Sequence, residues 1–242
     1  MGNDMSASRS SGAVRAVRDP ERHAHDPRTR AYLRDYTSVL DSVPFPSLLV
    51  DHRWDVAVTN SAYDLLFDGF RPHPTAMPRH NFLRLVLFHP DAGRVLRERE
   101  TSWCLPMLAQ FAAALDVHRQ DPVLKEIRHE IGQDPIMNAA FQQGLPHWVR
   151  AVGPGAVDHD GAVRPVQHPD PRWGRTTCRV VSETPSTLRA AGLTRLTLAL
   201  HPHGGTPAPE PEPAPESAAP APEHRGAPRL RVVRDTDTSD RG

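Results

Sequence analysis

Histidine and cysteine are the residue types of this chain that could bind a metal or act as a nucleophile. The chain contains 14 histidines and 2 cysteines. Two histidine pairs, His23 with His25 and His201 with His203, are separated by a single residue. Two imidazoles that share a metal on one helical face need a spacing of four residues. The histidine pattern therefore predicts no metal site.

The cysteines do not predict catalysis either. Cys104 lies in an apolar, helix-like stretch, where a buried thiol is inert. Cys178 has arginine neighbours that would lower its pKa, but no Cys–His pair is recognisable around it. The sequence also lacks a G-x-S-x-G elbow, a phosphate-binding loop and a dinucleotide fingerprint. We therefore expect no enzyme, and an enzyme of an unrecognised kind is the least favoured alternative.

Apolar side chains offer a third kind of chemistry, the binding of an apolar ligand. Trp103, Met107, Phe111 and Leu115 recur every four residues and form one stripe of a helix. Such a stripe fits a solid core or the wall of an apolar cavity. The spacing alone favours the core, because any buried helix shows it.

The amino-acid composition along the chain predicts the domain boundaries. The chain has 242 residues, of which 38% are hydrophobic, and 26 prolines that concentrate near the C-terminus. We predict a disordered arm at residues 1–28, one domain at 29–203 and a disordered Pro/Ala/Glu-rich tail at 204–242. A formal net charge of zero argues against direct nucleic-acid binding. No signal peptide or long apolar run is present, so we expect no membrane association and a cytoplasmic location.

Local patterns predict the elements that must position these side chains. A helix is expected over residues 32–40, strands over 48–50 and 54–59, and a helix capped by Ser61. Trp54, Val56 and Val58 alternate with polar or small residues and should share one face. Residues 82–88 fit a buried strand or a helix equally well.

The second half of the chain has clearer signals for the starts of helices. Asp121-Pro122 and Asp134-Pro135 each predict a helix start, and the second helix should end at Gly144. Strands are expected over 176–181 and 196–200, joined through a turn of helix. Strands at both ends with helices between them predict an α+β fold, with one antiparallel sheet and helices packed on one face.

Two stretches carry a family resemblance. PSLLVDHRWDVAVTNSAYDLLF resembles the opening of a PAS-type domain. Together with NFLRLVLFHPDAGRVL, DPVLKEIRHEI and ETPSTLRAAGLTRLTLALHPHG, it resembles the ligand-binding domain of MmyB-like transcription regulators of actinobacteria. The similarity extends from Thr29 to His203. It implies a PAS-like sensor domain that binds a small apolar, fatty-acid-like ligand and takes part in transcription regulation.

On this resemblance we assign a ligand site. Trp103, Met107 and Phe111 would face Val58 and Leu198 of the sheet, and Phe82 and Phe141 would close the sides. Asn81 or Arg84 would anchor a ligand head group. No other cofactor is expected.

The resemblance leaves the partner open. Family members carry an N-terminal helix-turn-helix, and residues 1–28 are too short and polar to form one. The chain would then act as a homodimer or pair with a helix-turn-helix regulator. Two alternatives are a ligand-free interaction module that works through its arm and tail, and a misassigned start codon with a helix-turn-helix upstream.

Overall fold

A computed structural model describes residues 27–201 and contains the expected mixture of helices and strands. The first part comprises α1 (Pro27–Asp41), β1 (Ser47–Val50), β2 (Val56–Thr59), α2 (Ser61–Leu66), α3 (Phe82–Phe88) and α4 (Ala92–Val95). The middle comprises the π-helix η2 (Arg99–Cys104), α5 (Leu105–Val117), α6 (Pro122–Gln133), α7 (Pro135–Ala139), the π-helix η3 (Ala140–Gly144), α8 (Leu145–Val152) and the 3₁₀ helix η4 (Gly153–Val157). The last part comprises β3 (Val163–Gln167), β4 (Arg175–Glu183), α9 (Ser186–Ala190) and β5 (Thr194–Leu200).

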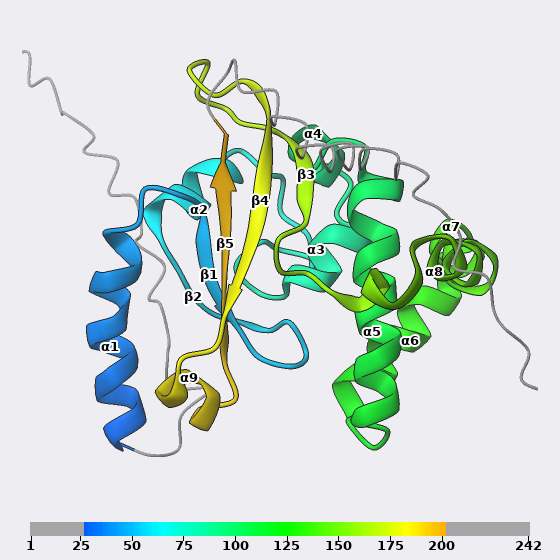
Figure 1. Cartoon of the computed structure of the whole chain (residues 1–242), viewed down its shortest axis with the longest axis horizontal. Coiled ribbons are helices and arrows are strands. Elements are labelled where there is room, and N and C mark those ends of the chain that lie inside the picture. The colour runs from blue at the N-terminus through cyan, green and yellow to red at the C-terminus, as the bar shows by residue number, and fades with distance from the viewer. Residues whose placement is uncertain (1–26, 202–242) are drawn as a thin grey trace, which may run out of the picture. The chain divides into compact units, whose positions relative to one another are not determined.

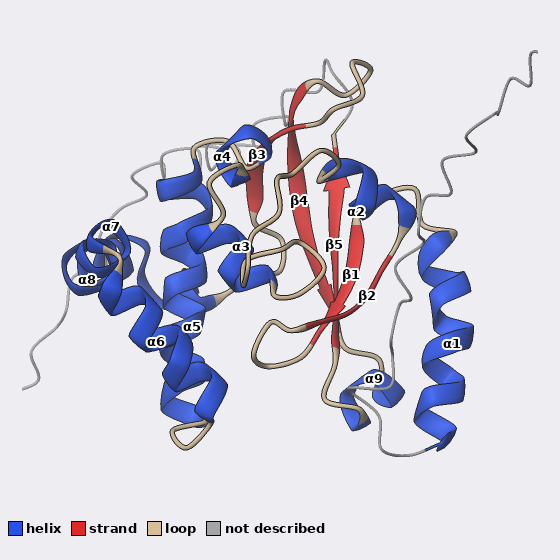
Figure 2. Cartoon of the chain, turned by 180° about the vertical axis from the view of Figure 1, so that it is seen from behind, coloured by secondary structure: helices blue, strands red, loops and turns tan. Residues whose placement is uncertain are grey.

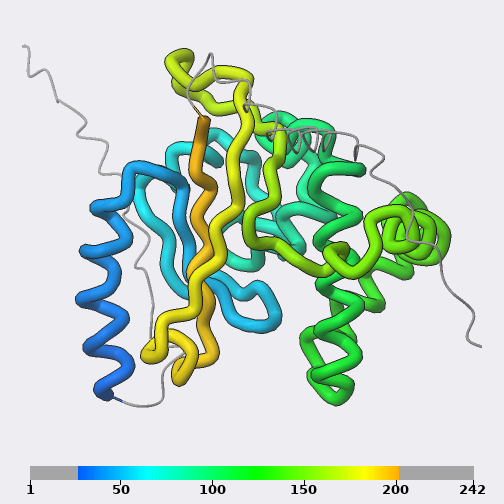
Figure 3. The backbone as a smooth tube through the Cα atoms, in the orientation of Figure 1, coloured from blue at the N-terminus to red at the C-terminus, as the bar shows by residue number. Residues whose placement is uncertain are grey.

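One antiparallel sheet joins the two ends of this region. Its five strands have the order β2-β1-β5-β4-β3. β1 pairs with β5 from Ser47 opposite Thr197 to Val50 opposite Thr194. The last strand therefore lies at the centre of the sheet, between β1 and β4 (Figure 3). The predicted α+β fold with late strands beside early ones is confirmed.

Helices cover both faces of this sheet, whereas the sequence predicted one covered face. The larger core contains Leu48, Val50 and Leu198 together with the helices from α3 to α8. Leu49 and Val58 point the other way and pack with Leu33, Tyr36 and Leu40 of α1 and Leu188 of α9. Figures 1 and 2 show α1 and the helices around α5 on opposite sides of the strands. Because β1 is apolar at successive positions, each of its faces needs a cover.

A β-bulge explains why Val58 is not on the predicted face. Leu49 pairs with Val58, but Val50 pairs with Val56, so Ala57 is an extra residue. An extra residue shifts the alternation of side chains by one position. Val56 accordingly packs against the larger core, and Val58 belongs to the core beneath α1.

The predicted helix starts at Asp121 and Asp134 are confirmed. Each carboxylate accepts hydrogen bonds from the backbone N–H groups two and three residues later. Two other boundaries were wrong. Gly144 has a right-handed backbone, and the chain continues into α8. That helix ends at Val152 and is followed by Gly153, where φ is +79°. The cap of α2 is Asn60 rather than Ser61.

Asn60 joins four segments through its buried amide. Its Oδ1 accepts from the backbone N–H of Ser47, in β1, and of Tyr63, in α2, at 2.9 Å each. Its Nδ2 donates to the carbonyl oxygens of Leu40, Val43 and Phe45 at 3.2, 3.0 and 2.9 Å. Asn60 is completely buried. The end of α1, the following loop, β1 and α2 therefore meet at one side chain.

The predicted tail and all but the last two residues of the predicted arm lie outside the described residues. Pro27 and Arg28 already belong to α1. Among residues 27–201, the helices are too short or too polar to span a bilayer.

We predict that Asn60→Ala lowers the free energy of unfolding by about 3 kcal/mol, because buried backbone groups lose their partners. Ser61→Ala is the matched control, since Ser61 is exposed and would have been the cap on the sequence pattern. It should change stability by less than about 0.5 kcal/mol. Urea unfolding measures both variants, and equal effects would contradict the role of Asn60.

Candidate functional site

The apolar residues predicted to bind a ligand form a packed core. Trp103, Met107 and Phe111 are completely buried, and Phe82 and Leu198 are nearly so, all in the larger cluster. Phe141 packs against that cluster, with its ring 6.2 Å from the ring of Phe111. Val58 lies in the other cluster, across the sheet. The structure thus brings together the predicted residues other than Val58.

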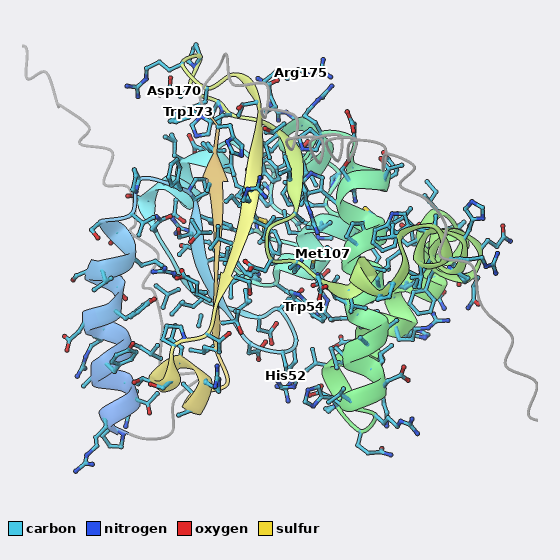
Figure 4. All side chains as sticks on the ribbon, viewed as in Figure 1. His52, Trp54, Met107, Asp170, Trp173 and Arg175 are labelled. Atoms are coloured by element: carbon cyan, nitrogen blue, oxygen red, sulfur yellow. The ribbon has the colours of Figure 1, made fainter. Side chains whose placement is uncertain are left out.

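A cavity of about 790 Å³ lies beside this core, between the strands and α5. Its wall is formed by Val50, Asp51, His52, Trp54, Gln110, Ala113, Ala114, Val157, Asp158, His159, Asp160, Ser182, Thr194 and Leu196. Figure 4 shows Trp54 and His52 between the strands and α5, below Met107. The volume is in the range of small-molecule sites. None of the residues predicted from the sequence to bind a ligand belongs to this wall.

Trp54 is held against the cavity by an unusual backbone. Its φ is +62°, a conformation that bulky side chains rarely adopt. Its N–H donates to the carbonyl oxygen of Asp51, and its own carbonyl oxygen accepts from the N–H of Phe82. The ring lies 6.4 Å from that of Phe111. The surrounding hydrogen bonds therefore fix an aromatic side chain between the core and the cavity.

The predicted head-group anchors have other partners. The side chain of Asn81 caps α3 by accepting from the N–H of Arg84, and it donates to Asp55 and to the Arg53 carbonyl. Arg84 donates from Nε and Nη2 to the two carboxylate oxygens of Glu130, at 2.8 Å each, and also contacts Glu126. Both side chains hold α3 in place and have no part in the cavity wall.

Asp121 connects the β1–β2 loop to the start of α6. Its Oδ1 caps the helix, and its Oδ2 accepts from Arg53 Nε at 2.7 Å and contacts His52 Nε2 at 3.0 Å. Burial opposes ionisation of this carboxylate, but the hydrogen bonds from Arg53 and His52 outweigh it and lower its pKa to about 2. His52 also stacks near His118, with ring centroids 4.4 Å apart. One carboxylate therefore fixes the loop that carries His52 and Trp54.

Three polar side chains in the cavity wall or next to it were not identified from the sequence. Gln110 and His159 line it, and Arg164 lies beside His159, with Nη2 2.9 Å from Nδ1. The guanidinium also lies over the Trp103 ring, 5.0 Å from its centre. Gln110 is a polar residue within the apolar run of α5, and this departure from the pattern could have been recognised in the sequence. The position of Arg164 was not predicted, because Pro165 weakens the strand pattern of β3.

The two cysteines are buried thiols. Burial raises the pKa of Cys104 to about 11 and that of Cys178 to about 12, despite neighbouring arginines. Both are therefore protonated and weakly nucleophilic at neutral pH. Within residues 27–201, no three His, Cys, Asp or Glu side chains are grouped so that they could hold a metal ion.

The family model of the MmyB-like transcription regulator ligand binding domain matches residues 33–162. This span runs from within α1 to beyond η4 and contains most of the cavity wall, apart from Ser182, Thr194 and Leu196. A comparison with curated proteins found no match.

We predict that Asp121→Asn destabilises the protein at pH 7 and that the difference from the wild type decreases as the pH falls from about 4 to 2. The reason is that the folded pKa of Asp121, about 2, lies below its ordinary value of 3.8. The stabilisation is therefore complete above pH 4 and is lost as the carboxylate is protonated. Urea unfolding between pH 7 and pH 2.5 measures it.

The matched control is Asp116→Asn, which changes an exposed aspartate near the end of α5. It should leave the pH dependence unchanged. A difference between Asp121→Asn and the wild type that stays constant across this range would contradict the prediction.

Proposed function

Because the chain belongs to the family of MmyB-like transcription regulator ligand-binding domains, we propose that its regulatory role depends on a small apolar ligand bound in the cavity between the sheet and α5. The observation that carries this proposal is the cavity of about 790 Å³, most of whose wall lies in the matched span. A ligand there would contact elements from both ends of the domain, since β1, α5 and β5 all contribute. Binding could thereby stabilise one arrangement of these elements.

The apolar part of the wall fits a hydrocarbon chain. Val50, Trp54, Ala114 and Leu196 line it, and Trp54 offers a rigid aromatic surface. Burial of each methylene contributes about 0.8 kcal/mol. A ligand with a chain of fatty-acid length would gain enough from burial to bind at micromolar concentration, after the cost of ordering it. We propose a fatty-acid-like ligand on this basis.

We further propose that ligand binding is transmitted to a partner, either a second copy of the chain or a helix-turn-helix regulator in the cytoplasm. The family match supports a role in regulation. The alternative of a ligand-free interaction module depends on the arm and the tail. These segments lie almost entirely outside the described residues, so that alternative stays a prediction.

We predict that Ala113→Trp weakens binding of the neutral apolar dye Nile red at least tenfold. Ala113 lines the cavity, and its position on the exposed side of α5 lets an indole fill the space without disturbing the core. Fluorescence titration of the full chain measures binding. Ala139→Trp, at an exposed position of α7, is the control and should bind Nile red as the wild type does.

Native mass spectrometry of the protein purified from its own host tests the natural ligand. The expected spectrum shows a bound species of a few hundred daltons. A wild-type protein that carries no such species and does not bind Nile red would overturn the proposed function.

A further inference from the structure

We propose that Arg164 binds the acid group of a monoanionic apolar ligand, beside the part of the cavity wall that contains His159 and Gln110. This inference rests on the proposed function and adds the residue that recognises the acid group of the ligand. Its starting point is a set of buried hydrogen-bond donors that have no acceptor.

Arg164 is a buried cation with no carboxylate partner among the described residues. It is 3% exposed, and Nη1 makes no hydrogen bond. Its Nη2 is bonded only to a histidine nitrogen, and its backbone pairs with Cys178, whose thiol is neutral. Buried arginines are normally paired, as Arg84 is with Glu130. The unpaired guanidinium is therefore suited to an anion that the protein itself does not supply.

His159 connects Arg164 to the cavity wall. A guanidinium can only donate, so Nδ1 of His159 must accept from Arg164, and the proton of the neutral ring lies on Nε2. Burial, reinforced by the charge of Arg164, lowers the pKa of His159 to about 3, so the ring is neutral at pH 7. Nε2 is buried without a partner, and so is Nε2 of Gln110 on α5. Unpaired nitrogen donors thus lie on β3, on the loop before β3 and on α5, and the last two belong to the cavity wall.

Carboxylates of the cavity wall, all more exposed than the Arg164 guanidinium, limit the charge of the ligand. Asp158 and Asp160 line it and are exposed, and Asp51 is half-buried. These charges disfavour a second anionic group on the ligand near the solvent. The site therefore selects one acid group on an otherwise uncharged molecule.

Access to the donors requires a movement of the wall. The unpaired nitrogen atoms have almost no solvent-accessible surface. The segment from Gly153 to Gly161 contains His159 and has a glycine with φ of +79° at each end. A shift of this segment away from α5 would admit an acid oxygen to the donors.

The test compares ligands that differ only in the head group. Decanoic acid, decan-1-ol and decanedioic acid are each used to displace Nile red from the full chain at pH 7.5. For the wild type, we expect decanoic acid to displace the dye at a concentration about tenfold lower than either decan-1-ol or decanedioic acid. A charge-assisted hydrogen bond has no equivalent in the alcohol.

Two buried arginines on the same side of the sheet provide a matched pair of variants. Arg164→Met should abolish the preference for the acid while Nile red still binds. Arg84→Met should keep the preference. Arg164→Gln, which retains a donor but no charge, should also lose most of the preference, and it replaces Arg164→Met if that variant does not fold.

Thermal unfolding without ligand separates recognition from a structural role. Arg164→Met removes an unpaired buried charge and should leave the melting temperature unchanged or raise it, whereas Arg84→Met breaks an ion pair and should lower it. Equal displacement by acid and alcohol in the wild type would overturn this inference and leave the proposed function intact. If no ligand displaces the dye, or the dye does not bind, the proposed function fails and the inference fails with it.

Discussion

The arrangement of this domain depends on one buried amide. Asn60 accepts hydrogen bonds from β1 and α2 and donates to three carbonyl oxygens between α1 and β1. These groups lie where a helix ends and the chain enters the sheet. Without Asn60, the N–H groups of Ser47 and Tyr63 and the carbonyl oxygen of Val43 would lose their partner. The amide therefore fixes where β1 begins, and through the pairing of β1 with β5 it fixes the centre of the sheet. An asparagine suits this position because a single side chain provides both acceptor and donors.

Two buried arginines in the same interior have different surroundings. On α3, Arg84 is paired with Glu130 and the surrounding space is filled by side chains. Beside β3, Arg164 has an aromatic ring and a neutral histidine for neighbours, and an open volume lies next to that histidine. The first arrangement stabilises the fold by itself. The second arrangement leaves the desolvation cost of the Arg164 guanidinium without a compensating ion pair. Such an uncompensated cost is typical of a ligand-binding site.

The sequence predicted what depends on local patterns and missed what depends on pairing across the fold. Asp121-Pro122 and Asp134-Pro135 start helices because their signals lie within three residues. Val58 was assigned to the wrong face because the bulge at Ala57 is a property of the β1–β2 pairing. Arg84 was interpreted as a ligand anchor because its partner, Glu130, is 46 residues away. The strand that carries Arg164 was missed because Pro165 is tolerated at a sheet edge, a position that only the topology reveals.

The central position of β5 has a consequence for synthesis of the protein. The hairpin of β1 and β2 and the hairpin of β3 and β4 are joined only through β5, the last described strand. Until that strand leaves the ribosome, the nascent chain presents two separate hairpins with unpaired edges and an incomplete core. The sheet can therefore be completed only after nearly all of the domain has been translated, and the strand edges exposed before that point are a hazard for aggregation.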